Sequence, residues 1–183
     1  MVCFVHIKEL AELERDEKWD EVRELLYETW AKDKLNYETF IRLFSECWYL
    51  LAEWDCWVNA GDLSFRAFKN TLIECTEFGM SNFMDNPRFL CLAGYMISMF
   101  PCLFFEHGSE KQYIDLEQKG VDMLCKAQEL DPNDKMAKIF NLGQTQGESK
   151  YKKALKSIAS ELATLFPGDT ELERYFIDIL SVR

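Results

Sequence analysis

The sequence predicts an all-α fold, a single antiparallel array of about eight or nine helices that extends over residues 1–183. Eight glycines and four prolines among 183 residues leave little room for the turns of a β architecture. Apolar residues recur at helical spacing along the chain, and strand-type alternation is absent. An apolar share of 48% and a charged share of 29% are typical of an ordinary soluble domain.

Three helices are expected in the amino-terminal half, after a short helix or arm around His6. The first covers about residues 16–31, where apolar side chains recur at helical spacing. Asn36 is suited to cap the next helix, which should run to about Val58 and is apolar over more than one face. Asp62 or Ser64 should cap a helix over about residues 65–78, with Gly79 as the residue that ends it.

The segment from Phe89 to Phe105 carries no charged side chain. It is shorter than the roughly 20 residues that cross a bilayer, and Pro101 interrupts it. A buried helix starting at Pro87 is the favoured interpretation, and an interfacial helix or an exposed docking surface are the alternatives. We expect no membrane partner.

Four further helices are expected in the carboxy-terminal half, at about residues 109–131, 134–143, 149–166 and 170–181. The last is amphipathic and follows Pro167. A stack of helices needs its exposed end covered, and this helix is expected to cover it.

Two proline-terminated segments share an order of residues that is typical of one repeat family. The second segment carries a Leu-Gly pair, an aromatic, a small residue, large apolar residues and a proline: Leu142-Gly143, Tyr151, Ala154, Ile158, Leu162 and Pro167. The first ends in Gly120, Leu124, Ala127 and Leu130-Asp131-Pro132-Asn133. This order resembles the tetratricopeptide repeat, closely over residues 105–183 and loosely over 15–104. The resemblance implies stacked helix pairs that bind other proteins.

The net charge of −11 is unevenly distributed. Residues 1–35 and 36–110 carry net charges of −4 and −6, whereas residues 111–183 carry −1. Such acidity argues against nucleic acid as a direct ligand, because phosphate contacts need Lys and Arg. It favours a basic protein as partner.

The sequence shows little sign of catalysis. Cys102, Glu106 and His107 lie close together, but they lack the spacing of a zinc site or the orienting group of a nucleophile pair. No phosphate-binding loop or hydrolase motif is present. We expect no enzyme activity, no metal and no cofactor. The seven cysteines form no CxxC pair and no signal peptide precedes them, so a reducing cytoplasm is expected.

The acidic and aromatic stretch before Pro132 is the candidate binding region. Interfaces favour tryptophan anchors, and acidic side chains around them attract a basic partner. The predicted partner-binding residues are Glu46, Glu53, Trp54, Asp55, Trp57, Asp62, Glu74 and Glu77. The alternative is that the rings simply fill a helical core. The carboxylates of the first helix, from Asp16 to Glu24, are interpreted as a solvated face.

Size, acidity and the resemblance together suggest a bacterial toxin immunity protein, of the contact-dependent growth inhibition type. It would neutralise a basic, nuclease-type toxin by occluding the active site. The alternative is a chaperone or adaptor, similar to the type III secretion translocator chaperones, which hold an extended peptide in a concave groove.

Overall fold

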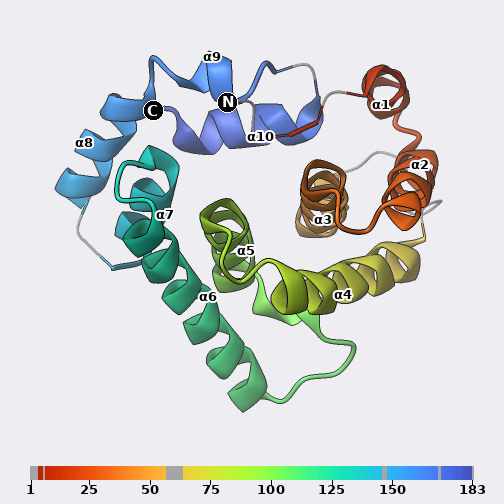
Figure 1. Ribbon diagram of the computed structural model, residues 1–183, viewed down its shortest axis with the longest axis horizontal. Coiled ribbons are helices and arrows are strands. Elements are labelled where there is room, and N and C mark those ends of the chain that lie inside the picture. The colour runs from red at the N-terminus through yellow and green to blue at the C-terminus, as the bar shows by residue number, and fades with distance from the viewer. Residues whose placement is uncertain (1–3, 6, 57–63, 146–147, 169, 183) are drawn as a thin grey trace.

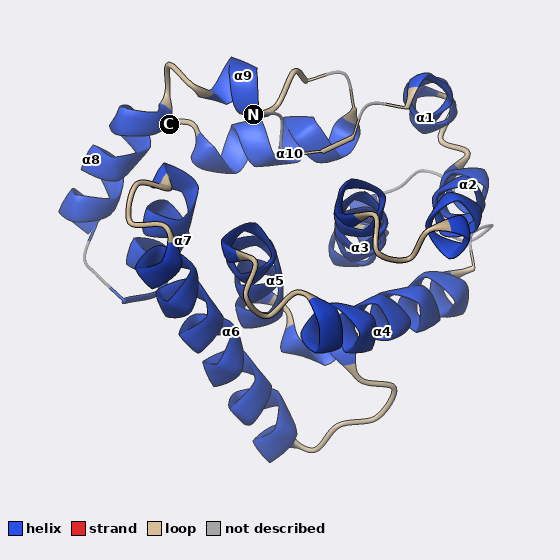
Figure 2. Cartoon of the chain, in the orientation of Figure 1, coloured by secondary structure: helices blue, strands red, loops and turns tan. Residues whose placement is uncertain are grey.

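The all-α prediction is confirmed. The computed structural model describes residues 4–5, 7–56, 64–145, 148–168 and 170–182. Within these ranges all regular structure is helical, and Figure 2 shows helices joined by loops.

Ten α-helices and two short 3₁₀ segments follow one another in the described ranges. Their bounds in chain order are α1 Lys8–Arg15, α2 Trp19–Lys32, α3 Tyr37–Ala52, η1 Trp54–Cys56, α4 Phe65–Asn82, α5 Pro87–Met99, η3 Pro101–Phe104, α6 Glu110–Leu130, α7 Lys135–Thr145, α8 Glu148–Ile158, α9 Leu162–Leu165 and α10 Glu171–Leu180.

The helices form an inner and an outer row (Figure 1). Helices α3, α5 and α7 make up the inner row, where α5 contacts both of its neighbours. Helices α2, α4 and α6 form the outer row. Helices α2 and α4 pack against α3, and α6 packs against α5 and α7. This arrangement of packed helices is compatible with a helical repeat-like fold.

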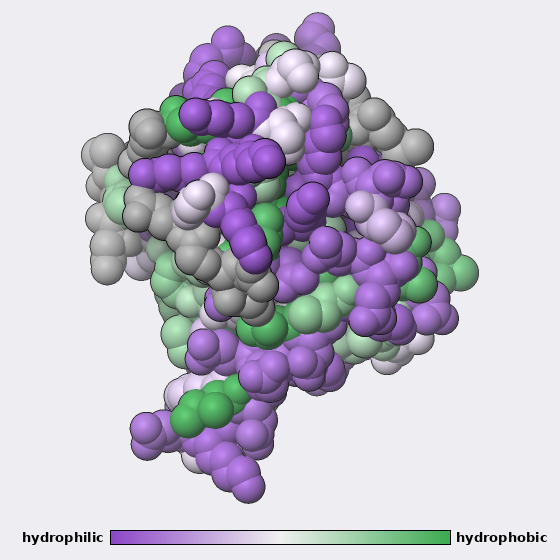
Figure 3. Space-filling view, turned by 90° about the vertical axis from the view of Figure 1, so that its left-hand side faces the viewer, coloured by the Kyte–Doolittle hydropathy of each residue, from purple (hydrophilic) through white to green (hydrophobic). Residues whose placement is uncertain are grey.

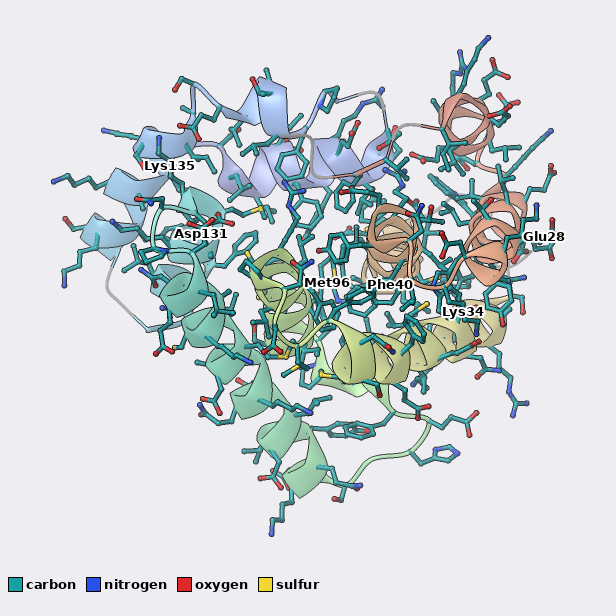
Figure 4. All side chains as sticks on the ribbon, in the orientation of Figure 1. Glu28, Lys34, Phe40, Met96, Asp131 and Lys135 are labelled. Atoms are coloured by element: carbon teal, nitrogen blue, oxygen red, sulfur yellow. The ribbon has the colours of Figure 1, made fainter. Side chains whose placement is uncertain are left out.

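Most of the uncharged segment is a buried helix, as favoured from the sequence, whereas Met99, Phe100 and Cys102 near its end are exposed. Helix α5 is buried from Phe89 to Ser98, and Figure 4 shows Met96 among the side chains of the interior. It packs closely on α6 because glycines meet there. A Cβ on Gly94 would lie 2.8 Å from the carbonyl oxygen of Gly120. In the described part of the chain, no helix combines the length and apolar character needed to cross a membrane.

The predicted helix starts are largely confirmed. Asn36 caps α3 by accepting a hydrogen bond from the Thr39 amide at 3.1 Å. Ser64 caps α4 by accepting from the Ala67 amide, whereas Asp62 lies outside the described residues. Pro87 occupies the first turn of α5.

Three predicted helix ends are wrong. Helix α3 stops at Ala52 rather than Val58, and η1 follows, with the Trp54 ring 4.9 Å from that of Phe65. Helix α4 continues past Gly79 to Asn82. Gly79 is required there for close packing, because a Cβ would approach the Phe89 ring to 2.6 Å.

The third wrong end lies in the segment over residues 149–166, which is divided into α8 and α9. Lys135 donates a hydrogen bond to the Ser157 carbonyl at 2.9 Å. In a longer α8 this carbonyl would accept from a backbone amide of the same helix. Figure 4 shows Lys135 beside α8.

Helix α10 does not cover the end of the stack, contrary to expectation. It lies across the inner row (Figure 1). Two consecutive aromatic residues join it to all three inner helices. The Tyr175 ring lies 5.6 Å from that of Trp48 on α3. The Phe176 ring lies 6.2 Å from Tyr95 on α5 and 6.5 Å from Phe140 on α7. This position buries Leu172, Phe176 and Leu180 completely.

Candidate functional site

The eight residues expected to bind a partner do not form one surface. Glu46 is fully buried and forms an ion pair with Arg42 at 2.9 Å, so it cannot border a docking site. Glu53 and Trp54 are half-buried at the end of α3. Trp57, Asp62 and the side chain of Asp55 lie outside the described residues.

The described tryptophans belong mainly to the core. Trp19, Trp30 and Trp48 are completely buried, and Trp54 packs on Phe65 and Phe68. These contacts favour the alternative drawn from the sequence, in which aromatic rings fill the space between helices.

Glu74 and Glu77 lie on α4, where it passes α2. Tyr27 of α2 donates a hydrogen bond to Glu74 Oε2 at 3.0 Å. Lys34 donates to Glu74 Oε1 at 3.1 Å and lies 4.4 Å from the centre of the Trp30 ring. The hydrogen bond to Glu74 raises the pKa of the Tyr27 hydroxyl, and burial acts in the same direction. These bonds fix α4 against α2.

Other carboxylates on both helices are exposed, whereas Glu74 itself is half-buried. The α2–α4 acidic face, as we define it, consists of Glu21, Glu24 and Glu28 on α2 and Glu74 and Glu77 on α4. The α2 members are spaced by three and four residues, opposite the buried residues of that helix. Figure 4 shows Glu28 directed away from the body of the molecule. Glu21 and Glu24 belong to the run of carboxylates that the sequence predicts to be a solvated face.

A second carboxylate cluster is buried where three helices meet. Arg42 of α3 forms ion pairs with Glu14 of α1 and with Glu46 of its own helix. It also donates to Thr170 Oγ1 at 3.2 Å, and the Glu171 amide donates to Glu14 Oε2 at 3.0 Å. This cluster attaches the start of α10 to α1 and α3.

The buried cluster holds more carboxylates than cations. Burial raises the pKa of Glu46 to about 8, with Glu14 and Glu173 acting in the same direction and Arg42 opposing them. Burial also raises the pKa of Glu14. Within the described residues, both oxygens of Glu46 lack a hydrogen bond of good geometry. The cluster therefore joins α1, α3 and α10, and the raised pKa values predict that its contribution to stability depends on pH.

The residues weighed as metal ligands or as a nucleophile pair lie at the surface. Cys102, Glu106 and His107 are all exposed, and His6 lies outside the described residues. Nowhere in the described ranges do three or more His, Cys, Asp or Glu side chains gather as metal ligands would.

Comparison with known proteins finds no family model, curated protein or solved structure that matches this chain.

Proposed function

We propose that this chain is a non-catalytic binding protein, and that its α2–α4 acidic face binds a folded, basic partner. The five carboxylates of this face lie on two helices. Arg23 pairs with Glu24, Lys34 pairs with Glu74, and Lys32 is exposed four positions after Glu28. A surface of one sign attracts a partner of the other sign and increases the rate of association.

The partner class we favour is a basic toxin of the nuclease type, which the chain would neutralise as an immunity protein. A nuclease presents a cationic cleft for nucleic acid, and an acidic helical surface would compete for it. The tetratricopeptide-like order of Tyr151, Ala154 and Pro167 supports a binding scaffold and is part of the same proposal.

The position of α10 favours this function over a chaperone. A chaperone of this type would hold an extended peptide against the inner row of helices. In this chain Tyr175 and Phe176 of α10 already contact that row. An extended peptide would have to displace a helix with three fully buried apolar side chains, Leu172, Phe176 and Leu180.

Charge reversal tests the acidic face. The variant carries Glu24→Lys and Glu28→Lys, both exposed on α2. Its matched control carries Glu117→Lys and Glu129→Lys, both exposed on α6. Tagged wild-type and variant chains would be used to capture partners, and each partner would then be purified and its association rate measured against salt.

The expected partner has a high isoelectric point, and its association with the wild-type chain slows as salt rises. The α2 variant should bind at least about tenfold more weakly, and the α6 control should bind normally. A neutral or acidic partner, or equal loss in both variants, would contradict the proposal.

The chaperone alternative has a separate test in Phe176→Ala, which loosens α10. One outcome is that peptide binding increases in this variant while binding of the basic partner still requires Glu24 and Glu28. That result would mean that the inner row of helices has its own affinity for peptides. If only the peptide binds, the acidic-face proposal is wrong.

A further inference from the structure

A buried cluster of charged side chains lies where α1, α3 and α10 meet. Among the described residues it gathers three carboxylates around one cation, Arg42 of α3, and each of these side chains is at most 5% exposed. The carboxylates are Glu14 of α1, Glu46 of α3 and Glu173 of α10. If all three were ionised, one guanidinium would have to neutralise them away from water. Burying unpaired charge is costly, so the folded chain favours a bound proton in this cluster.

Glu46 is the carboxyl best placed to hold this proton. Both of its oxygens lack a hydrogen bond of good geometry within the described residues. Glu14 instead accepts from the Glu171 amide at 3.0 Å, and Glu173 accepts from a backbone amide at 3.3 Å, and such bonds favour an ionised carboxylate. The charged groups that Glu46 faces lie on three helices: Arg42 on α3, Glu14 on α1 and Glu173 on α10. Burial is the largest effect and raises the pKa of Glu46 to about 8.

The cluster joins α1 and the start of α10 to each other as well as to α3. Arg42 pairs with Glu14 of α1 and donates to the Thr170 hydroxyl at the start of α10. The ring of Phe4, which precedes α1, lies 5.7 Å from the ring of Phe176 on α10. We name α1 and the first turn of α10 the clasp, because the same side chains attach both of them to α3.

Each half of the clasp adjoins a residue with a left-handed backbone. Glu17, between α1 and α2, has a φ of 54°, which is uncommon for a residue other than glycine. Its conformation costs free energy, and the contacts of α1 offset this cost while the clasp is closed. Gly168, before α10, has a φ of 85°, which glycine adopts readily. Glu17 therefore favours opening when those contacts weaken, and Gly168 allows the start of α10 to turn.

We propose that this cluster is a proton-operated latch. With the proton on Glu46 it holds the clasp on α3, and loss of that proton to solvent releases α1 and the start of α10 together. The ionised Glu46 then repels Glu14 and Glu173, one in each half of the clasp, and a single guanidinium cannot neutralise all three. The latch does not depend on the α2–α4 acidic face, because no residue of that face belongs to the cluster.

The direction of the pH response follows from the two states of Glu46. In the open clasp the carboxyl is hydrated and has an ordinary pKa, whereas in the closed clasp its pKa is raised to about 8. The closed state is therefore favoured most at low pH and loses this advantage as pH rises to about 8. Burial also raises the pKa of Glu14, which acts in the same direction. The opening constant should increase by up to about tenfold per pH unit.

The latch controls how well the inner row is covered. Trp48, Tyr95 and Phe140 lie beneath α10 and are at most 8% exposed. The outer surface on the side of α8 is, in contrast, mainly hydrophilic (Figure 3). Once the first turn of α10 has left α3, only the later part of the helix, from Tyr175 onward, still covers these rings. Opening of the clasp is thus the first step in exposing the aromatic surface of the inner row.

Hydrogen–deuterium exchange of the full-length chain, followed by mass spectrometry, tests the latch between about pH 6 and about pH 9. Each rate is corrected for intrinsic exchange. Peptides from α1 and α10 report on the clasp, and peptides from α5 report on the body of the array. Low concentrations of urea are added, because a local opening exposes little surface and responds weakly to urea, whereas global unfolding responds strongly. Glu46→Gln removes the titrating group, and Glu38→Gln, at an exposed position of α3, is the matched control.

In the wild type and in Glu38→Gln, protection of the clasp should fall about tenfold or more as pH rises from about 6 to about 8. Urea should hardly affect this opening, and α5 should be better protected and respond steeply to urea. In Glu46→Gln the protection of the clasp should not vary with pH.

The proposal is overturned if the clasp and α5 share one protection and one urea dependence, since only global unfolding then occurs. This comparison needs only the wild-type chain and stands whether or not Glu46→Gln folds. The proposal is also overturned if protection of the wild-type clasp is independent of pH, or if its pH dependence survives in Glu46→Gln. Separate opening of α1 and α10 would equally contradict it.

Discussion

Arg42 on α3 donates a hydrogen bond to Oγ1 of Thr170 at 3.2 Å, across 128 positions of sequence. Thr170 is the N-cap of α10, and its hydroxyl also accepts a hydrogen bond from the Glu173 amide. A single guanidinium therefore joins the interior of the array to the start of the helix that covers the inner row.

Replacing Arg42 should be among the most destabilising single changes in the chain. Arg42→Met leaves Glu14 and Glu46 buried without their cation, which typically costs about 3–5 kcal/mol of unfolding free energy. Urea unfolding followed by tryptophan fluorescence measures the loss. Arg66→Met is the control, because Arg66 is exposed on α4 and should change stability by less than about 0.5 kcal/mol. Equal effects of the two substitutions would refute a structural role for the cluster.

Stability should depend on pH through Glu46. Its pKa is raised to about 8, so the native state favours the protonated carboxyl more than the unfolded chain does. The stabilising contribution is fully present below the unfolded pKa and is lost as pH rises towards about 8. Groups facing Glu46 are Arg42 on α3, Glu14 on α1 and Glu173 on α10.

Glu46→Gln isolates this effect, since glutamine resembles the protonated acid and does not titrate. The variant should gain stability relative to the wild type by up to about 1.4 kcal/mol per pH unit within the titration range. Urea unfolding at several pH values measures the difference. Glu38→Gln, at an exposed position of α3, should show a difference that is independent of pH. A flat difference for Glu46→Gln would mean that its carboxyl is ionised throughout.

Two glycine-to-alanine changes should act in opposite directions. Gly94→Ala brings a methyl group to 2.8 Å from the Gly120 carbonyl oxygen, and the backbone there cannot move aside as a side chain can. Overpacking should cost about 1–3 kcal/mol, more than the roughly 1 kcal/mol that alanine gains in helix propensity. Gly143→Ala has room at 3.4 Å from Tyr151 and should stabilise the chain. Thermal unfolding compares them, and destabilisation by both would contradict the packing described here.

The predicted binding site shows where sequence reasoning succeeds and fails. The sequence predicts that Glu46 and Glu77 share one acidic surface, yet Glu46 is fully buried and Glu77 is exposed. Apolar and polar residues are mixed along both of their helices. The periodicity within one helix therefore does not reveal which neighbouring helix covers Glu46. The spacing of Glu24 and Glu28 indicates one helix face, but the approach of their helix to Glu74 depends on the contact between α2 and α4, where Tyr27 donates to Glu74.

The sequence by itself determined the helical class, most helix starts and the buried character of α5. These depend on local interactions, such as the Asn36 cap and the Pro87 first turn, which need only adjacent residues. The tertiary structure alone decided that α10 lies across the inner row, that Glu46 is buried with Arg42, and that Gly79 lies within a helix. Each of these depends on the free energy of packing between residues far apart in the chain, which no local pattern encodes.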